Sequence, residues 1–238
     1  MSNRVFFLFC VLITISACSP KYYSPNTLNV PLISQKAETN LTVAGNGNQI
    51  EFQAAYGMTN SFSLMANGGL YIPAELDNGN GGSGKLAEIG GGYFRKILDN
   101  WLFESYAILG YGTFENHLPS TIASFPQTTG KISGSIFRIG VQPSFGYKSK
   151  YLSAAVSARL SNLNYSNING DLIFDNVDQV KYLNENSGFI LIEPALTLKA
   201  GLEKVKIQIQ YTYSLNASER DFKQDKSNLT FGLNFNFQ

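Results

Sequence analysis

The sequence predicts an all-β fold, namely a transmembrane antiparallel up-and-down β-barrel with ten strands, or eight as the alternative. Three observations predict it: segments of about ten residues that alternate apolar and polar, an alternation of short and long connections, and an amphipathic last segment. The chain of 238 residues suits one barrel domain. Charged residues make up 15% of it and aromatic residues 13%, with 22 glycines, a composition typical of strands and turns.

The chain divides into three expected regions: a signal peptide at 1–17, a tether at 18–37 and a barrel at 38–238. The first region has one charged residue, Arg4, followed by the apolar run VFFLFCVLITI at 5–15. That run is too short for a membrane helix, which needs roughly 20 residues, but it suits the core of a signal peptide.

The end of the apolar run predicts a lipid anchor. Ile15-Ser16-Ala17-Cys18 resembles the lipobox of bacterial lipoproteins. The resemblance implies cleavage before Cys18 and attachment of lipid, including palmitate, to that residue. The alternative is cleavage by the general signal peptidase, which leaves Cys18 as an ordinary thiol. Because Cys10 is the only other cysteine, the body of the chain has no disulfide or cysteine metal site.

The region from 18 to 37 is expected to be an extended, lipid-anchored periplasmic tether. After the cysteine it carries three prolines and shows no periodicity. Surface lipoproteins of Bacteroidota carry an acidic tag soon after the cysteine, and residues 19–23 (SPKYY) contain no acid. The lipid is therefore expected to face the periplasm. Tyr22, Tyr23 and Phe125 are expected to be exposed anchoring points for a partner.

The alternating segments predict the individual strands. The clearest is 205–213 (VKIQIQYTY), where every other residue is apolar or aromatic, and 229–237 repeats the pattern. The ten expected strands lie around residues 41–43, 50–56, 62–72, 85–97, 101–115, 137–141, 152–160, 190–198, 205–213 and 229–237.

Charged residues of both signs occupy the second face of these segments. Such a face suits a polar lumen in which Glu and Arg pair away from lipid, but it also suits the solvated outside of a soluble barrel. In a lumen, the charges would either plug the barrel or line a narrow path for small solutes. We favour the plug, because open channels generally need more strands. The predicted lumen charge network consists of Glu51, Glu88, Glu104, Arg138, Arg159, Glu193 and Lys206.

Connection lengths predict an orientation. Connections are short at 59–60, 98–100, 148–150 and 200–203, and long after the third, fifth, seventh and ninth segments. This asymmetry is typical of outer-membrane barrels, whose long loops are extracellular. Both termini are then expected to be periplasmic.

The last strand carries a motif. Thr230-x-Gly232-x-x-Phe235-x-Phe237 resembles the C-terminal signal that the barrel-assembly machinery reads, with Gln238 as one extra residue. The chain as a whole resembles small outer-membrane β-barrel proteins of the Bacteroidota kind with a lipobox, in pattern only and over 38–238. That resemblance implies a fold and a Gram-negative outer membrane but no activity.

The residues that could carry catalysis do not form a recognisable pattern, which argues against an enzyme. His117 is the single histidine, no Asp lies in its segment, and Ser120 is three residues away across a proline. No cofactor and no metal site is predicted, and the absence of a Lys/Arg run argues against nucleic acid. The expected function is a structural or interaction role, such as an accessory subunit of a larger outer-membrane complex. The expected partners are outer-membrane lipid, the assembly machinery and another outer-membrane protein. A narrow solute channel is the alternative, and an outer-membrane hydrolase is third.

Overall fold

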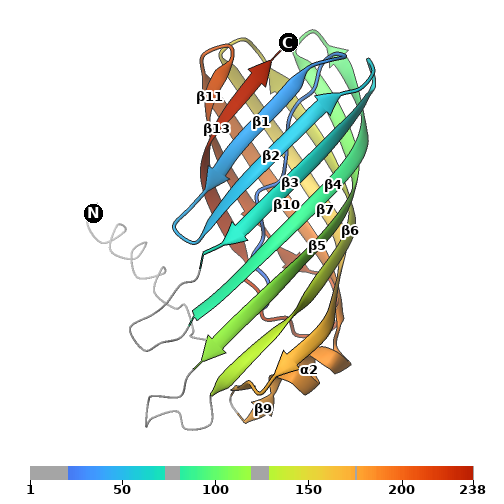
Figure 1. Ribbon diagram of the computed structural model, residues 1–238. Helices are drawn as coiled ribbons and strands as arrows, with labels where there is room; N and C mark the ends of the chain where they lie inside the picture. The colour runs from blue at the N-terminus through green and yellow to red at the C-terminus, as the bar shows by residue number, and fades with distance from the viewer. Residues whose placement is uncertain (1–20, 73–80, 119–128, 175, 238) are drawn as a thin grey trace, which may run out of the picture.

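The chain forms a closed antiparallel barrel of ten long strands (Figure 1). The computed structural model describes residues 21–72, 81–118, 129–174 and 176–237. Pairing of β1 with β13, from Thr39 opposite Phe237 to Gly45 opposite Phe231, closes the barrel. The predicted ten-stranded fold is confirmed, and each expected segment corresponds to one strand. The strands are β1 (Thr39–Gly45), β2 (Gln49–Gly57), β3 (Phe62–Tyr71), β4 (Gly81–Leu98), β5 (Trp101–Leu118), β6 (Gly130–Lys148), β7 (Leu152–Gly170), β10 (Gly188–Gly201), β11 (Val205–Tyr213) and β13 (Ser227–Phe237).

The two ends of the barrel differ in their connections, as predicted. Four short connections, after β2, β4, β6 and β10, lie at what we call the short-turn end, at the top of Figure 1. The opposite, long-loop end holds the longer connections and the short β1–β2 turn. The connection from β7 to β10 contains β8 (Ile173–Phe174), β9 (Val177–Asp178) and the helix α2 (Gln179–Glu185), and β12 (Leu215–Asn216) pairs with β10. Among the described residues, no helix is both long and apolar enough to cross a bilayer.

The two faces of the barrel wall have opposite chemistry. Large apolar side chains point outward and are half-exposed, for example Phe52, Ile89 and Ile207 at 52%, 64% and 62%. Near the short-turn end the outer face carries aromatic rings, with Trp101 stacked on Phe145 at 5.1 Å. The inward positions of the same strands are mostly polar and buried. The apolar face is therefore the outer one, which excludes a soluble barrel with an apolar core and a solvated outside.

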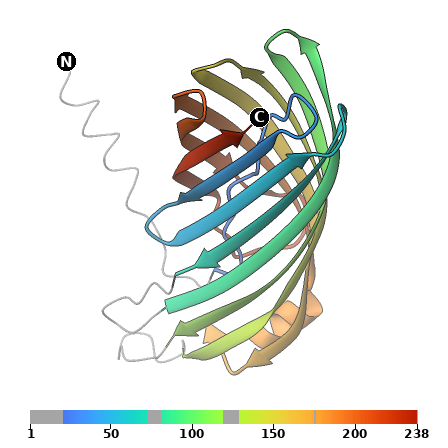
Figure 2. The same cartoon turned by 45° about the horizontal axis from the view of Figure 1, so that its top comes forward.

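The N-terminal segment lies inside the barrel, so its prediction as a tether outside the barrel is wrong. Residues 22–33, which we call the lumen segment, are buried apart from the half-buried Ser24. Figures 1 and 2 show this part of the chain as a blue thread that runs through the lumen. The segment is extended, as predicted, but a polar lumen offers its backbone hydrogen bonds that the sequence pattern does not reveal. Tyr22 and Tyr23, predicted to be exposed, are 1% and 5% exposed, and Phe125 lies outside the described residues.

The described chain begins and ends at opposite ends of the barrel. Lys21 lies at the long-loop end, where its carbonyl accepts a hydrogen bond from Asn116 Nδ2 at 2.8 Å. After crossing the lumen, the chain turns at the short-turn end, where the Ala37 amide donates to the Gly57 carbonyl at 2.7 Å. Phe237 lies at this same end, opposite Thr39. The expectation that both termini face one compartment is therefore wrong for the described chain, because the segment runs the full length of the lumen.

The closing strand β13 places its motif residues on both faces. Thr230 points into the lumen and contacts the Thr27 hydroxyl at 3.1 Å. Side chains alternate along β13, and the odd-numbered Phe235 and Phe237 have the outward parity, which means that they belong to the outward-facing set. Gly232 lies opposite Ala44 of β1. A Cβ atom at Gly232 would lie 2.6 Å from the Val43 carbonyl oxygen and 2.9 Å from Ala44 Cβ, so the seam between β1 and β13 has no room for one.

We expect Gly232→Ala to weaken barrel closure, by about 1–3 kcal/mol for an overpacked site. The measurement is urea unfolding of protein refolded in detergent micelles, with the folded fraction at each urea concentration read from its heat-modifiable migration on a gel. Gly68→Ala in β3 is the matched control, because a Cβ atom there meets nothing within 4 Å. Equal unfolding midpoints for the two variants would contradict the packing argument.

Candidate functional site: the occupied lumen

The barrel wall binds the backbone of the lumen segment through side chains. The Thr27 amide donates to both carboxylate oxygens of Glu51, at 2.9 and 3.1 Å. The Gln210 amide group forms a two-bond pair with Leu28, accepting from its N–H at 2.6 Å and donating to its carbonyl at 2.9 Å. Glu104 accepts from the Leu32 amide at 3.3 Å. These are hydrogen bonds that a neighbouring strand would otherwise supply.

The carbonyl groups of the segment are matched in the same way. Each acceptor below faces an inward donor from β2, β3, β6, β10 or β13, so these donors come from strands on different sides of the barrel. The acceptors with their donors are Ser24 with Tyr71, Pro25 with Asn228, Thr27 with Gln53, Asn29 with Gln142, Val30 with Lys199 and Leu32 with Lys148, at 2.7–3.0 Å. Pro25 and Pro31 have no N–H group, which reduces the number of buried donors that need a partner.

An ion network crosses the middle of the lumen. Arg138 pairs with Glu88 at 2.7 Å, and Arg159 pairs with Glu193 at 2.7 Å and lies 3.9 Å from Glu88. Gly110 lies between Glu88 and Arg138 in the register of β4, β5 and β6. A Cβ atom at Gly110 would lie 3.0 Å from Glu88 Cγ, so this glycine leaves the space in which the two side chains meet.

The lumen segment completes this network. The Tyr23 hydroxyl donates to Glu193 at 2.6 Å and accepts from Arg138 at 2.6 Å. The Asn26 side chain accepts from Arg138 at 2.8 Å and donates to Glu88 at 3.0 Å. Because every charge here is almost fully buried, each needs opposite charge and hydrogen bonds to offset its lost hydration.

All seven charged residues predicted for the lumen point into it and are buried. The structure brings Glu88, Arg138, Arg159 and Glu193 together, whereas Glu51 and Glu104 bind the lumen segment separately. Lys206 lies apart, near the short-turn end, and donates to the Ser149 carbonyl at 3.2 Å.

Several residues of the site are absent from the set that the sequence predicted. Lys199 has the same inward parity in β10 as Glu193, so the alternation could have found it. Lys148, at the end of β6, could have been found in the same way. Tyr23 and Asn26 have no such signal, because they lie in a segment without strand periodicity.

Apolar contacts hold the two ends of the lumen segment. At the long-loop end, Tyr22 and Tyr23 pack into a cluster of buried rings: Phe114, Tyr165, Phe189 and Phe222. Toward the short-turn end, Leu28, Val30 and Leu32 form a second cluster with Leu102, Ala155 and Ala195. Ile33 belongs to a third cluster, which includes Phe94 and Tyr106.

Glu38 fixes the point where the segment joins β1. Its carboxylate forms an ion pair with Lys148 and accepts hydrogen bonds from the Ser34 amide at 2.7 Å and from Asn236 at 2.8 Å. Burial alone would raise the pKa of Glu38, but the Lys148 charge and these hydrogen bonds outweigh it and lower the pKa. Glu38 is thus held as a carboxylate at neutral pH.

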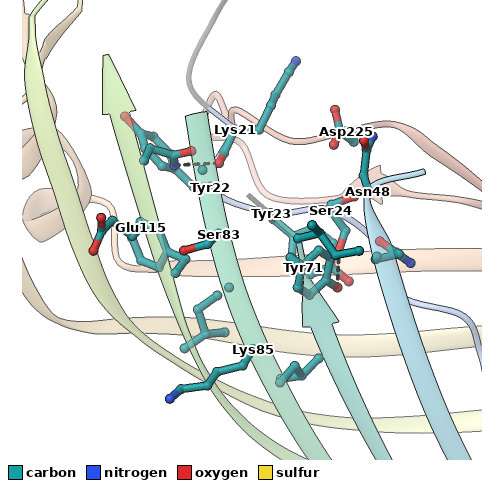
Figure 3. A pocket seen from close by; sticks show the side chains of 18 of the residues that line it. Lys21, Tyr22, Tyr23, Ser24, Asn48, Tyr71, Ser83, Lys85, Glu115 and Asp225 are labelled. Atoms are coloured by element: carbon teal, nitrogen blue, oxygen red, sulfur yellow. Dashed lines mark hydrogen bonds between the residues drawn. The ribbon is translucent and has the colours of Figure 1, made fainter. Parts of the chain in front are cut away.

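A cavity of about 510 Å³ opens above the lumen segment at the long-loop end. Figure 3 shows Lys21, Lys85, Glu115 and Asp225 around it, with Tyr71 directed toward Ser24. Several of its polar groups already bind each other or the chain: Asn46 donates to Asn228 at 2.7 Å and Asn116 binds the Lys21 carbonyl. The cavity therefore forms a vestibule whose wall includes the first residues of the lumen segment.

His117 lies away from the lumen charges. It is exposed near the end of β5 and has the outward parity, whereas the inward residues of this strand, including Glu104 and Asn116, have even numbers. In the part of the chain that the structure describes, no group of three His, Cys, Asp or Glu residues is placed to hold a metal ion.

No protein-family model and no curated protein matches the chain. Among solved structures, the chain is similar to a "KdgM porin" with a TM-score of 0.38 and 8% identity, covering 84% of this chain and 99% of that one. It is similar to "LpxR from Salmonella typhimurium" with a TM-score of 0.35 and 8% identity, over 84% and 99%. A "NanC porin" gives 0.36 and 10% identity, over 84% and 98%.

We expect Glu88→Gln to destabilise the barrel by about 3 kcal/mol or more, because removing one partner leaves buried guanidinium charge uncompensated. The measurement is the urea unfolding free energy in micelles. The control is Lys150→Gln, which removes a surface pair with Glu203 in which the side chains are 57% and 62% exposed, and whose loss costs at most about 1 kcal/mol. Two variants of equal stability would contradict the role given to the ion network.

Proposed function

We propose that this protein is a non-enzymatic outer-membrane barrel that is closed to solutes by its own N-terminal segment and has a structural or interaction role. The observation that carries the proposal is the occupied lumen. Residues 22–33 lie buried in it, and side chains of β2, β6, β10 and β11 bind backbone groups at its centre, from Thr27 to Val30. A water-filled path for solutes would need these side chains to face water instead.

The outer surface supports a membrane location. A continuous band of large apolar side chains surrounds the barrel, and aromatic rings lie at its short-turn end. Exposing such a band to water would be unfavourable at roughly 25 cal/mol per Å², whereas lipid chains cover it without that loss. Because the wall is a β-barrel with signal-peptide features upstream, the bacterial outer membrane is the membrane that fits.

Orientation follows from the loops and has a consequence for the lipid anchor. With the long loops outside, the short turns and Phe237 are periplasmic, whereas Lys21 lies on the cell-surface side. Cys18 is three residues before Lys21, and three residues of extended chain span at most about 11 Å. A lipid on Cys18 would then lie close to the cell-surface side. This replaces the periplasmic lipid expected from the missing acidic tag.

The orientation can be tested by labelling intact cells with a membrane-impermeant maleimide. We expect Lys21→Cys and Lys131→Cys, both at the long-loop end, to react from outside. Lys204→Cys, in the short turn after β10, should react only after the outer membrane is permeabilised. If Lys21→Cys and Lys204→Cys required the same treatment, the proposed path through the lumen would be wrong.

Closure can be tested by conductance in planar bilayers. The natural protein should be silent, and Thr27→Asp should produce channel openings, because it places a second carboxylate against Glu51, which Thr27 now binds through its N–H and hydroxyl. Gln35→Glu is the control, since Gln35 is exposed at the short-turn end, two residues beyond the lumen segment. Steady conductance by the natural protein would contradict the closed barrel.

A narrow channel is the second candidate function. It is favoured by the polar character of the wall, which would hold water if the segment withdrew.

The interaction role can be tested by co-purification from detergent-solubilised outer membranes. We expect a partner whose recovery is lost when the long loops are replaced and is kept when the short turns are replaced.

A further inference from the structure

The lumen segment contacts the barrel as a bound peptide contacts a receptor. Every pairing of the ten long barrel strands joins them to one another or, for β10, to β12. Within the described residues, the segment has one isolated bridge, Tyr23 to Gln224, which lies outside the named strands. Backbone hydrogen bonds join the segment to the loop before β13, from the Tyr22 amide to the Lys223 carbonyl and from the Asp225 amide to the Tyr23 carbonyl, both at 2.9 Å. The barrel ladder is therefore complete without the segment, and the wall strands bind its backbone through their side chains.

We propose that the lumen is a binding site for an extended peptide, and that the resident segment is a ligand which a separate peptide of the same sequence can replace. This rests on the proposed closed lumen. The ligand class follows from three regions of contact: a pair of aromatic residues at the N-terminal end, a polar centre, and alternating aliphatic residues at the C-terminal end.

The polar centre recognises backbone as well as side chain. Gln210 hydrogen-bonds to both the backbone N–H and the carbonyl of Leu28, and Glu51 accepts from the backbone N–H of Thr27. Any residue other than proline would supply such an N–H group. Side-chain selection comes from Tyr23 and Asn26, whose polar atoms join the Glu88–Arg138 and Arg159–Glu193 pairs. A polypeptide satisfies this set, since amide donors and acceptors repeat along it at the spacing of an extended chain.

The site also imposes a direction. The ring cluster around Tyr22 lies at the long-loop end, and the aliphatic clusters around Leu32 and Ile33 lie toward the short-turn end. A peptide bound in the opposite direction would place its aliphatic residues beside the groups that now accept hydrogen bonds from Tyr22 and Tyr23. The buried charges would then lose the hydrogen bonds that the segment gives them. The N-terminus of the ligand therefore points to the long-loop end.

The experiment uses the full chain and cuts it after folding. A protease recognition sequence is inserted between Lys36 and Ala37, two exposed residues at the short-turn end. The resident segment carries Thr27→Asp so that it binds weakly. After cleavage in micelles, a fluorescent peptide of residues 21–36 with the natural sequence is added, and its binding is followed by fluorescence anisotropy. The conductance of the cleaved barrel is then measured in planar bilayers with and without this peptide.

We expect saturable binding of one peptide per barrel and loss of the conductance caused by Thr27→Asp. The same peptide N-methylated at Leu28 lacks the donor to Gln210 and should bind at least about tenfold more weakly. N-methylation at Lys36, outside the lumen, should leave binding unchanged.

A cleaved barrel that stays heat-modifiable but binds no peptide, or binds both N-methylated peptides equally, would overturn the peptide site. If the natural, uncleaved protein is silent in the same bilayers, the closed-lumen proposal survives that failure. If the natural protein conducts, the closed-lumen proposal itself is wrong, and the two failures are thereby distinguished.

Discussion

The charges buried in the lumen require partners, and much of the structure depends on how those partners are supplied. Arg138, Arg159, Glu88 and Glu193 come from four strands, and their burial is tolerated because they pair with one another. The pairing is incomplete without the chain that passes between them. Tyr23 and Asn26 supply further hydrogen bonds to these charges, so that segment and wall each bind groups that the other buries. Removing either would leave charge or backbone in need of water.

The same requirement explains why an extended segment can cross the lumen without forming a strand of the sheet. A buried peptide backbone needs a partner for each N–H and C=O group. The wall strands already use their own backbone groups in a closed ladder, so the partners that they offer are inward-pointing side chains of Glu, Gln, Asn, Lys and Tyr. Backbone partners come only at the N-terminal end of the described segment, where Tyr22 and Tyr23 bind the loop before β13. Two prolines lower the number of donors that must be matched, and the aliphatic residues find apolar patches near the short-turn end.

The sequence predicted the wall of the barrel well, because alternation with a period of two is a local property. The alternation that puts Phe231 outside also puts Thr230 inside, and it placed all seven charges of the predicted lumen network in the lumen. It could not say which charges meet. Glu88 and Arg138 are 50 residues apart, and their contact depends on the strand register and on the space that Gly110 leaves between them.

By itself, then, the sequence determined the faces of the strands, the alternation of connections and the polar character of the interior, and it favoured ten strands over eight, since each follows from local patterns of residue type. Only the tertiary structure decided that residues 22–33 lie inside the lumen and that the described chain starts and ends at opposite ends of the barrel. The physical reason is that a segment with prolines and no periodicity looks the same in sequence whether water or a polar wall surrounds it. The difference lies in side chains such as Glu51 and Gln210, far away along the chain, that satisfy its backbone in place of water.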